Sequence, residues 1–295
     1  MMRKTLTLSV IFQAGSLNFG EGTANISELK KFHRGNGEVY TFASRQSIRY
    51  DIVRLGNELF GWNLKTVDKN KGVVQFKEDV TIADSVEMDL FGYLKTGSKP
   101  RKRPAVVRLS HALALEPYKG DMEFLNNMGL AERAGETPNL ANIEQHLSHY
   151  AYHLSVDLDR VGIDEEVELP VEERVKRVQQ LLDILKVLNR DIRGRRENLA
   201  PLFAIGGVYP FSNPLFMGRV SLRGSAGRWS INIDPLQEAL QTSWNGTSGQ
   251  ELTRIGLVTG WLDNESDIRD RCGTVHSIEQ FFQLIGQDVQ AAFGA

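Results

Sequence analysis

Four stretches of the chain have the hydrophobic pattern of buried strands. Residues 5–12 alternate polar and apolar side chains and then become continuously apolar, which is typical of a strand with at least one buried face. Residues 149–163 also alternate, and we expect them to form a central strand. Residues 202–208 and 216–223 predict two further strands, joined by a loop that contains Pro and Asn.

Apolar residues at three- and four-residue spacing predict helices in residues 41–54, 171–190 and 277–293. Residues 25–28 have the spacing of a capping box and predict a short helix through residue 31. Strands in this order, with helices between some of them and long inserts elsewhere, favour an α+β sheet with helices on one face.

The helix predicted in residues 41–54 carries cations beside its apolar stripe. Arg45 and Arg49 are four residues apart and are therefore neighbours along one edge. With Ser44 as the N-cap, Arg45 falls in the first turn, where the helix dipole disfavours a cation and attracts an anion. These cations could be solvated surface charges, or they could be placed to bind an anion. The apolar stripe is formed by Ile48, Ile52, Leu55 and Leu59.

The strongest local charge imbalance follows a strand that we predict in residues 86–94. No acidic residue occurs between Leu90 and Leu115, and prolines place the basic residues in a loop before a strand predicted in residues 105–115. Such a loop is consistent with a solvated turn or with contacts to a polyphosphate backbone. The basic residues are Lys95, Lys99, Arg101, Lys102, Arg103 and Arg108.

A second basic cluster, from Arg190 to Arg196, follows the helix predicted in residues 171–190. Cations at a helix C-terminus complement the dipole, so we expect this cluster to cap the helix.

Composition indicates a globular protein. The 295 residues are 41% hydrophobic and 24% charged, which is normal for a chain with a substantial core. The single cysteine, Cys272, excludes an internal disulfide and a thiolate-rich zinc site. No apolar run reaches the roughly 18 residues of a membrane span, so we expect no membrane partner and a cytoplasmic location. The net charge of -2 argues against generic nucleic-acid binding unless the basic residues gather on one face.

Catalytic chemistry is weakly indicated. His146, His149 and His153 are the only histidine cluster, but they lack the glutamate of the zincin pattern and are more readily explained as packing or surface residues. Cys272 and His276 lie close in sequence, which is poor evidence for a nucleophile and base. We therefore predict no catalytic residue, metal or cofactor.

Three N-terminal segments closely resemble the DevR family of CRISPR-associated proteins, within the RAMP superfamily. They are GSLNFGEG at residues 15–22, RGNGEVY at 34–40 and SRQSIRYD at 44–51. Shorter segments that share the resemblance are residues 89–93, 114–118 and 204–207.

The resemblance implies an α+β fold with an RNA-recognition-motif-like (ferredoxin-like) palm in residues 1–61 and 149–295. It also implies a finger insert in residues 62–115 and a thumb-like insert in residues 116–148. Members of the family form the repeated backbone subunit of type I-B Cascade-like complexes. We therefore expect copies to assemble along CRISPR RNA and to present its bases to target DNA. The implied partners also include the large subunit, the cap subunit and the guide-processing endonuclease.

The same resemblance implies particular RNA contacts. A Ser-x-Gln-x-x-Lys/Arg motif that grips the guide backbone in relatives matches Ser44, Gln46 and Arg49, with Arg45 as an additional cation. A thumb wedge between bases is expected from Phe124 or Met128, since an apolar side chain tolerates contact with base faces. The residues expected to bind RNA are Ser16, Asn18, Arg34, Ser44, Arg45, Gln46, Arg49, Lys99, Arg101, Lys102, Arg103 and Arg108.

Two alternatives remain open from the sequence. Related subunits of type III complexes cut target RNA with an acidic residue, and Glu21, Glu28 and Asp89 are available for a metal-dependent ribonuclease on the same fold. A DNA-binding regulator is the other alternative.

Overall fold

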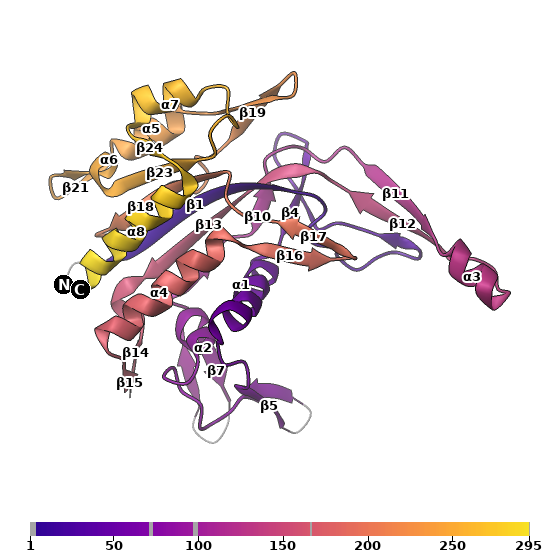
Figure 1. Ribbon diagram of the computed structural model, residues 1–295, viewed down its shortest axis with the longest axis horizontal. Coiled ribbons are helices and arrows are strands. Elements are labelled where there is room, and N and C mark those ends of the chain that lie inside the picture. Colours follow the sequence, from indigo (N-terminus) through magenta and orange to yellow (C-terminus); the bar gives the residue numbers. More distant parts are fainter. Residues whose placement is uncertain (1–3, 71–72, 97–99, 166, 295) are drawn as a thin grey trace.

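The computed structural model describes residues 4–70, 73–96, 100–165 and 167–294, and it is a mixed α+β fold built on one large sheet (Figure 1). Within these residues nine strands form the sheet, in the order β24-β23-β18-β1-β13-β10-β4-β3, with β9 beside β13. The predicted α+β class is confirmed. The strands are β1 Thr5–Ala14, β3 Lys31–His33, β4 Val39–Ala43, β9 Val107–Leu109, β10 Ala112–Ala114, β13 Ser148–Asp157, β18 Phe203–Tyr209, β23 Thr253–Leu257 and β24 Val275–His276.

β1 and β13 form the centre of the sheet. They pair antiparallel along their whole length, from Thr5 opposite Asp157 to Ala14 opposite Ser148, and β18 pairs antiparallel with the other edge of β1. The strands predicted in residues 5–12 and 202–208 and the central strand of residues 149–163 are therefore confirmed. β13 ends earlier than predicted, because the 3-10 turn η1, Leu158–Arg160, follows it.

Three long helices cover one face of the sheet (Figure 1): α1 Arg45–Phe60, α4 Val171–Lys186 and α8 Ile278–Phe293. Alternate residues of β1, including Leu8 and Phe12, point into the core that these helices close. Burying one apolar stripe of each helix is the main source of its stability. The three predicted long helices are confirmed, although residues 41–43 belong to β4 and α4 ends at Lys186, before the predicted residue 190.

Residues 211–252 and 258–272, on either side of β23, cover part of the opposite face, where Ile11 of β1 and Phe203 and Ile205 of β18 enter a second core. Hollows lined by residues of β3, β9, β10 and β13 lie beside this cover. This half of the sheet face is therefore accessible. The covering helices are α5 Asp234–Leu240, α6 Gly249–Leu252 and α7 Glu265–Cys272.

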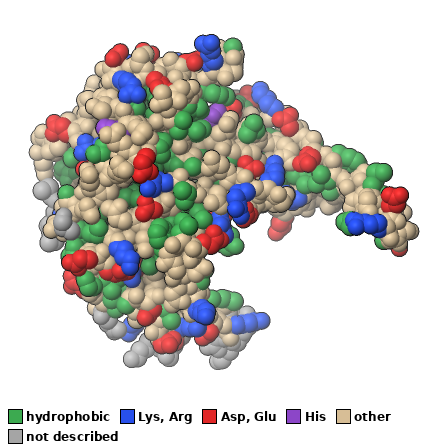
Figure 2. All heavy atoms as spheres, viewed as in Figure 1, with side chains coloured by type: hydrophobic (Ala, Val, Ile, Leu, Met, Phe, Trp, Pro, Cys, Tyr) green, Lys and Arg blue, Asp and Glu red, His purple; other side chains and the backbone are tan. Residues whose placement is uncertain are grey.

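Two parts project from this body, and Figure 2 shows the molecule hollowed between them. The arm, residues 121–145, consists of β11 Asp121–Asn126, α3 Met128–Ala134 and β12 Leu140–Gln145 (Figure 1). β2, Ile26–Ser27, pairs with β12 at the base of the arm. The lobe consists of β5 Val67–Asn70, β6 Val73–Phe76, α2 Val86–Phe91, β7 Tyr93–Lys95 and β8 Arg101–Arg103.

Short hairpins complete the described chain. Among the described residues, no helix combines the length and apolar character needed to cross a bilayer. The hairpin strands are β14 Ile163–Asp164, β15 Val167–Glu168, β16 Asn189–Ile192, β17 Arg195–Asn198, β19 Leu222–Ser225, β20 Arg228–Ile231, β21 Ser243–Trp244 and β22 Thr247–Ser248.

The prediction of a helix in residues 25–31 is wrong. Thr23 and Ile26 exchange two backbone hydrogen bonds of 3.0 Å around Ala24, which has a φ of 53°. This tight turn leads into β2 instead of a helix, so the capping-box residues bond to a neighbouring strand segment.

The strand predicted in residues 86–94 is wrong over most of its length, because residues 86–91 form α2 and β7 begins only at Tyr93. The Ser85 hydroxyl caps this helix by accepting the Met88 N–H at 3.2 Å. Met88 to Phe91 are all buried, including the charged Asp89, and so short a buried stretch does not distinguish helix from strand by its period.

Two further strand predictions are wrong in their extent. Residues 105–115 form two strands, because their register against β13 shifts by one residue between Leu109, which lies opposite Leu154, and Leu113, which lies opposite Ala151. At the shift the Ser110 hydroxyl, in place of a backbone carbonyl, accepts the His153 N–H at 2.9 Å. Residues 216–221 form turns around Gly218, whose φ is 78°, and β19 begins only at Leu222.

Candidate nucleic-acid interface

Polar side chains fix the start of α1 at the residues of the predicted motif. The Ser44 hydroxyl accepts the Ser47 N–H at 3.2 Å, which confirms Ser44 as the N-cap. The Ser44 N–H in turn donates to Asn18 Oδ1 at 3.0 Å. Ser44 and Asn18 therefore position the first turn, and they leave Arg45 and Gln46 exposed on its surface.

The first turn of α1 opens onto a groove of about 460 Å³ between the helix and β9. Within the described chain, the Arg45 guanidinium makes no ion pair with another side chain, while its backbone N–H donates to His111 Nδ1 at 3.1 Å. A cation left in the first turn without a counter-ion favours an external anion. The groove is lined by Arg45, Gln46, Arg49, Phe91, Ala105, Val107, Arg108 and Leu109.

Arg49 and Arg108 face the same groove but already have carboxylate partners. Arg49 donates to Glu87 at 2.8 Å, and its guanidinium lies 5.2 Å from the centre of the Phe91 ring. Arg108 donates to Asp157 at 2.8 Å. Because both arginines remain partly exposed, a phosphate would have to compete with these surface pairs, which contribute little stability.

Ser16 does not fit the predicted RNA contact. Its side chain is fully buried, donates to Gln145 Oε1 at 2.9 Å and accepts the His146 N–H at 3.0 Å. These bonds connect the loop after β1 to the base of the arm, so Ser16 holds the two segments together.

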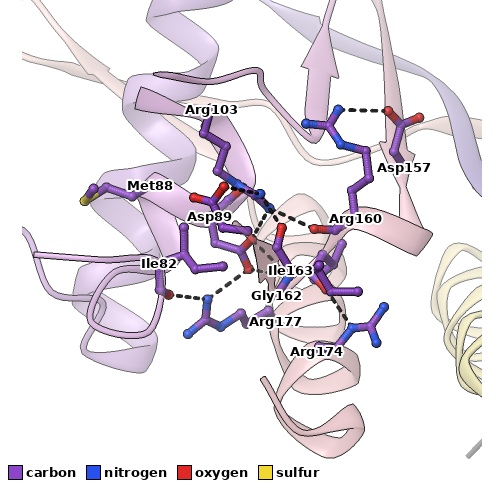
Figure 3. Close-up of polar contacts among 12 residues, drawn as sticks. Ile82, Met88, Asp89, Arg103, Asp157, Arg160, Gly162, Ile163, Arg174 and Arg177 are labelled. Carbon is purple, nitrogen blue, oxygen red and sulfur yellow. Dashed lines mark hydrogen bonds and ion pairs between the residues drawn. The ribbon is translucent and has the colours of Figure 1, made fainter. Parts of the chain in front are cut away.

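Arg103 does not fit a phosphate contact either, because it lies in a buried ion cluster with Asp89 and Arg177 (Figure 3). Arg103 donates to Asp89 Oδ1 at 2.6 Å and Arg177 to Oδ2 at 2.9 Å, and the Gly162 N–H approaches both oxygens at 3.0 Å. The cluster joins the lobe to α4, and no more than 3% of each of the three charged side chains is exposed.

The rest of the predicted basic run is divided. Lys95 is buried and donates to the carbonyls of Glu78 and Val80 at 3.1 and 2.6 Å. Lys102 is exposed on β8, with Arg101 half-buried beside it. Lys99 lies outside the described residues. The run is therefore partly an internal scaffold of the lobe, and only part of it can meet RNA.

The prediction that the arginine cluster after α4 caps that helix is wrong, because the cluster forms the β16–β17 hairpin. Arg190 donates to Asp51 at 2.8 Å and to the Leu17 carbonyl at 2.9 Å. Arg193 lies 4.2 Å from the centre of the Phe19 ring, and Arg195 reaches the Ser16 carbonyl at 3.5 Å. The hairpin thus holds the loop after β1 against α1.

The other predicted RNA contacts are exposed. Arg34, in the turn after β3, lies 5.1 Å from the centre of the Tyr40 ring. Phe124 on β11 and Met128 at the start of α3 expose 60% and 61% of their surface on the arm. Met122, Leu125, Leu130 and Leu140 are also exposed on the arm, and a group of exposed apolar side chains is typical of an interaction surface.

The three clustered histidines have separate partners. The Nδ1 atoms of His146, His149 and His153 lie 2.7, 3.0 and 2.7 Å from Thr41, Glu116 and Ser9. No group of three His, Cys, Asp or Glu side chains that could hold a metal occurs among the described residues. Burial raises the pKa of the Cys272 thiol, which disfavours the reactive thiolate.

Sequence reasoning missed the aromatic residues beside the groove. Phe32 is 42% exposed on β3, and its neighbours Phe42 and His111 come from β4 and the β9–β10 connection. Only the strand order brings these residues together. The one signal in the sequence is a phenylalanine within a polar segment, between Lys31 and Arg34.

Residues 6–221 match the model of a family described as CRISPR-associated negative auto-regulator DevR/Csa2. A curated relative, "CRISPR-associated protein Cas7/Cst2/DevR" from Myxococcus xanthus (strain DK1622), is 30% identical over 159 residues. That match covers 47% of this chain and 52% of the relative, so the chain spans about half the length of the curated relative.

The whole fold is similar to solved chains of CRISPR RNA-guided surveillance complexes. One, from a complex described as pre-nicking, has a TM-score of 0.60 and 15% identity, and the match covers 98% of this chain and 100% of that one. Another has a TM-score of 0.60 and 17% identity, with 98% and 99% coverage. At this identity the likeness concerns the fold. The family model, in contrast, matches well over half of the sequence, and it confirms the family indicated by the N-terminal motifs: the chain belongs to the DevR/Csa2 family of CRISPR-associated proteins.

Proposed function

We propose that this chain is the repeated backbone subunit of a type I-B CRISPR surveillance complex. Copies bind side by side along CRISPR RNA through its phosphates and present its bases for pairing with target DNA. A guide must carry any sequence, so its protein scaffold should contact the backbone and leave the base edges free.

The observation that carries this proposal is the groove at the start of α1. Arg45 and Gln46 project into it without partners in the described chain, and Arg49 and Arg108 flank it. These side chains offer charge and hydrogen-bond donors but no shaped pocket for one base, which suits recognition of phosphate and ribose. Family membership and the fold of surveillance-complex chains support the same role.

We assign an RNA-recognition-motif-like palm to residues 1–61 and 149–295, a finger insert to 62–115 and a thumb to 116–148. The antiparallel sheet with long helices on one face supports the palm, and the projecting arm supports the thumb. β9 and β10 fall within 62–115 but pair with β13, so the finger joins the palm through the sheet. The further partners are the large, cap and guide-processing subunits, and the proposed location is the cytoplasm.

The test is assembly of the purified chain on single-stranded RNA of increasing length, followed by light scattering coupled to gel filtration. We expect the number of protein copies per particle to rise with RNA length, because each copy covers a fixed stretch of backbone. Double-stranded DNA of equal length is the control and should not form the series. Absence of RNA binding at low salt would refute the proposal.

For the arm we propose that Phe124 and Met128 wedge between bases. Phe124→Ala combined with Met128→Ala should abolish periodic nuclease protection of bound RNA while the protein still binds, because the phosphate contacts remain. Unchanged protection would reject the wedge. Val187→Ala is the control, since this residue is 50% exposed and lies outside the thumb.

We do not assign the ribonuclease alternative. Among its candidate acids, Asp89 is occupied by two arginines inside the protein. Incubation of the protein and bound RNA with and without Mg²⁺ or Mn²⁺ tests this directly. Site-specific, metal-dependent cuts that disappear in Glu21→Gln or Glu28→Gln would establish the alternative.

A further inference from the structure

Three rings form a cluster at the accessible edge of the sheet. Phe32 on β3 and Phe42 on β4 stack with their centres 4.1 Å apart and their planes 13° apart. The two residues are diagonal neighbours on paired strands, a position from which aromatic side chains reach each other. His111 closes the cluster, 5.0 Å from Phe42 and 5.8 Å from Phe32. Phe32 is the exposed member of this aromatic cluster.

The aromatic cluster is continuous with the cationic groove. His111 Nδ1 accepts the Arg45 N–H, so one ring contacts both the start of α1 and the two phenylalanines. A hollow of about 390 Å³ beside the cluster shares Ser110, His153 and Met217 with a second hollow. That second hollow shares Arg108 and Leu109 with the groove at α1.

Polar groups line the two hollows that continue from the groove at α1. Because His111 Nδ1 accepts a hydrogen bond, the neutral ring carries its proton on Nε2 and can donate it. His153 is held at Nδ1 by Ser9 at 2.7 Å and also lines the hollow. Arg34 lies at its rim. An exposed ring, neutral imidazoles and a nearby cation are together more suited to a nucleobase than to a phosphate.

We propose that the hollow beside the aromatic cluster holds an unpaired base of the bound RNA, stacked on the face of Phe32, while the same strand's phosphates contact Arg45 and its neighbours in the groove at α1. The inference rests on the proposed RNA-binding function and adds a base site to it. Stacking on an aromatic face tolerates every base, so this contact does not restrict the guide sequence. Continuity with the cationic groove favours RNA over a protein segment as the occupant.

The test compares oligoadenylate with an abasic ribose-phosphate strand of the same length, in binding titrations at several salt concentrations. Phe32→Ala should weaken oligoadenylate binding about 5- to 150-fold, the loss expected from 1–3 kcal/mol of stacking. It should leave both abasic-strand binding and the salt dependence unchanged, because the phosphate contacts remain. Phe32→Trp should retain oligoadenylate binding and should show quenching of the new indole fluorescence when the base stacks.

Phe60→Ala is the matched control, since Phe60 is 36% exposed at the other end of α1. It should leave both affinities unchanged. Equal affinities of wild type and Phe32→Ala for oligoadenylate, or equal losses on both strands, would overturn the base site alone. Failure of the wild-type protein to bind either strand would instead overturn the proposed function.

Discussion

Two regions of this protein carry arginines in opposite environments. One joins the lobe to α4, and the other is the start of α1. Around Asp89, the guanidinium groups of Arg103 and Arg177 are buried and fully engaged inside the protein. At the start of α1, Arg45 projects into an open groove and has no carboxylate partner in the described chain. The first region holds the fold together, and the second is available to a ligand.

The difference teaches that a cationic run in sequence does not indicate where its charges point. Strand β8 alternates its side chains, so Lys102 faces solvent while Arg103 enters the ion cluster. Charge density alone would rank both residues equally as RNA contacts. Burial and existing partners separate them.

The largest expected effect is on stability, from Asp89→Ala. This change removes the buried carboxylate that the two guanidinium groups share and leaves, among the described residues, only Glu173, 3.0 Å from Arg177, and Asp164, 3.8 Å from Arg103. Breaking a buried ion pair typically costs about 3–5 kcal/mol. Urea denaturation should show a correspondingly lower free energy of unfolding. Asp234→Ala is the control, because Asp234 pairs with Arg271 at 2.7 Å on the surface and should cost less than about 1 kcal/mol. Equal losses would break the distinction between buried and exposed pairs.

The hollow beside the aromatic cluster contributes a pH-dependent effect through His153, whose pKa is lowered to about 4 by burial. The unfolded chain protonates this histidine near its ordinary pKa, while the folded chain resists, so stability is lost as pH falls from about 6.5 towards 4. At about 1.4 kcal/mol per pKa unit, the loss is at most about 3 kcal/mol. His153→Gln should show a smaller decrease in unfolding free energy between pH 7 and 4. An identical decrease in both proteins would exclude His153 as a cause.

The smallest effect on stability, but a clear one on binding, is expected for Arg45→Gln combined with Arg49→Gln. Neither side chain is buried, so the unfolding free energy should change by less than about 1 kcal/mol. The slope of log affinity for single-stranded RNA against log salt should become shallower by up to about 1.4, since each phosphate contact contributes about 0.7. Arg271→Gln combined with Arg269→Gln is the control, which tests whether removing two cations elsewhere on the surface changes the slope by the same amount. An unchanged slope would remove α1 from the interface.

The sequence predicted the elements whose period is long and regular. α1 and its Ser44 cap, the central strands and the closing helix α8 all follow from side-chain spacing. The short helix α2 could not be predicted in this way, because six residues, four of them buried, contain too few turns to reveal a helical period.

The candidate site was predictable only where it is local in sequence. Ser44, Arg45, Gln46 and Arg49 occupy one helix start, so the motif indicates their proximity. Phe32, Phe42 and His111 meet because β4 lies between β3 and β10 in the sheet, and no spacing rule contains that strand order. The burial of Arg103 depends likewise on Arg160 and Ile163, whose carbonyls it reaches across the fold (Figure 3).

The arm is long and joins the body at a narrow base, so a small rotation at the base displaces its tip. Six-residue strands of about 20 Å and the helix beyond them give a length of roughly 30 Å, so a tilt of about 10° at the base moves the tip by roughly 5 Å. The base is held by β2 and by Glu144, which accepts from Lys31 at 2.6 Å and from the Leu29 N–H at 2.6 Å. These few bonds therefore fix the direction of the arm, and with it the positions of Phe124 and Met128, the two residues that we propose as the wedge.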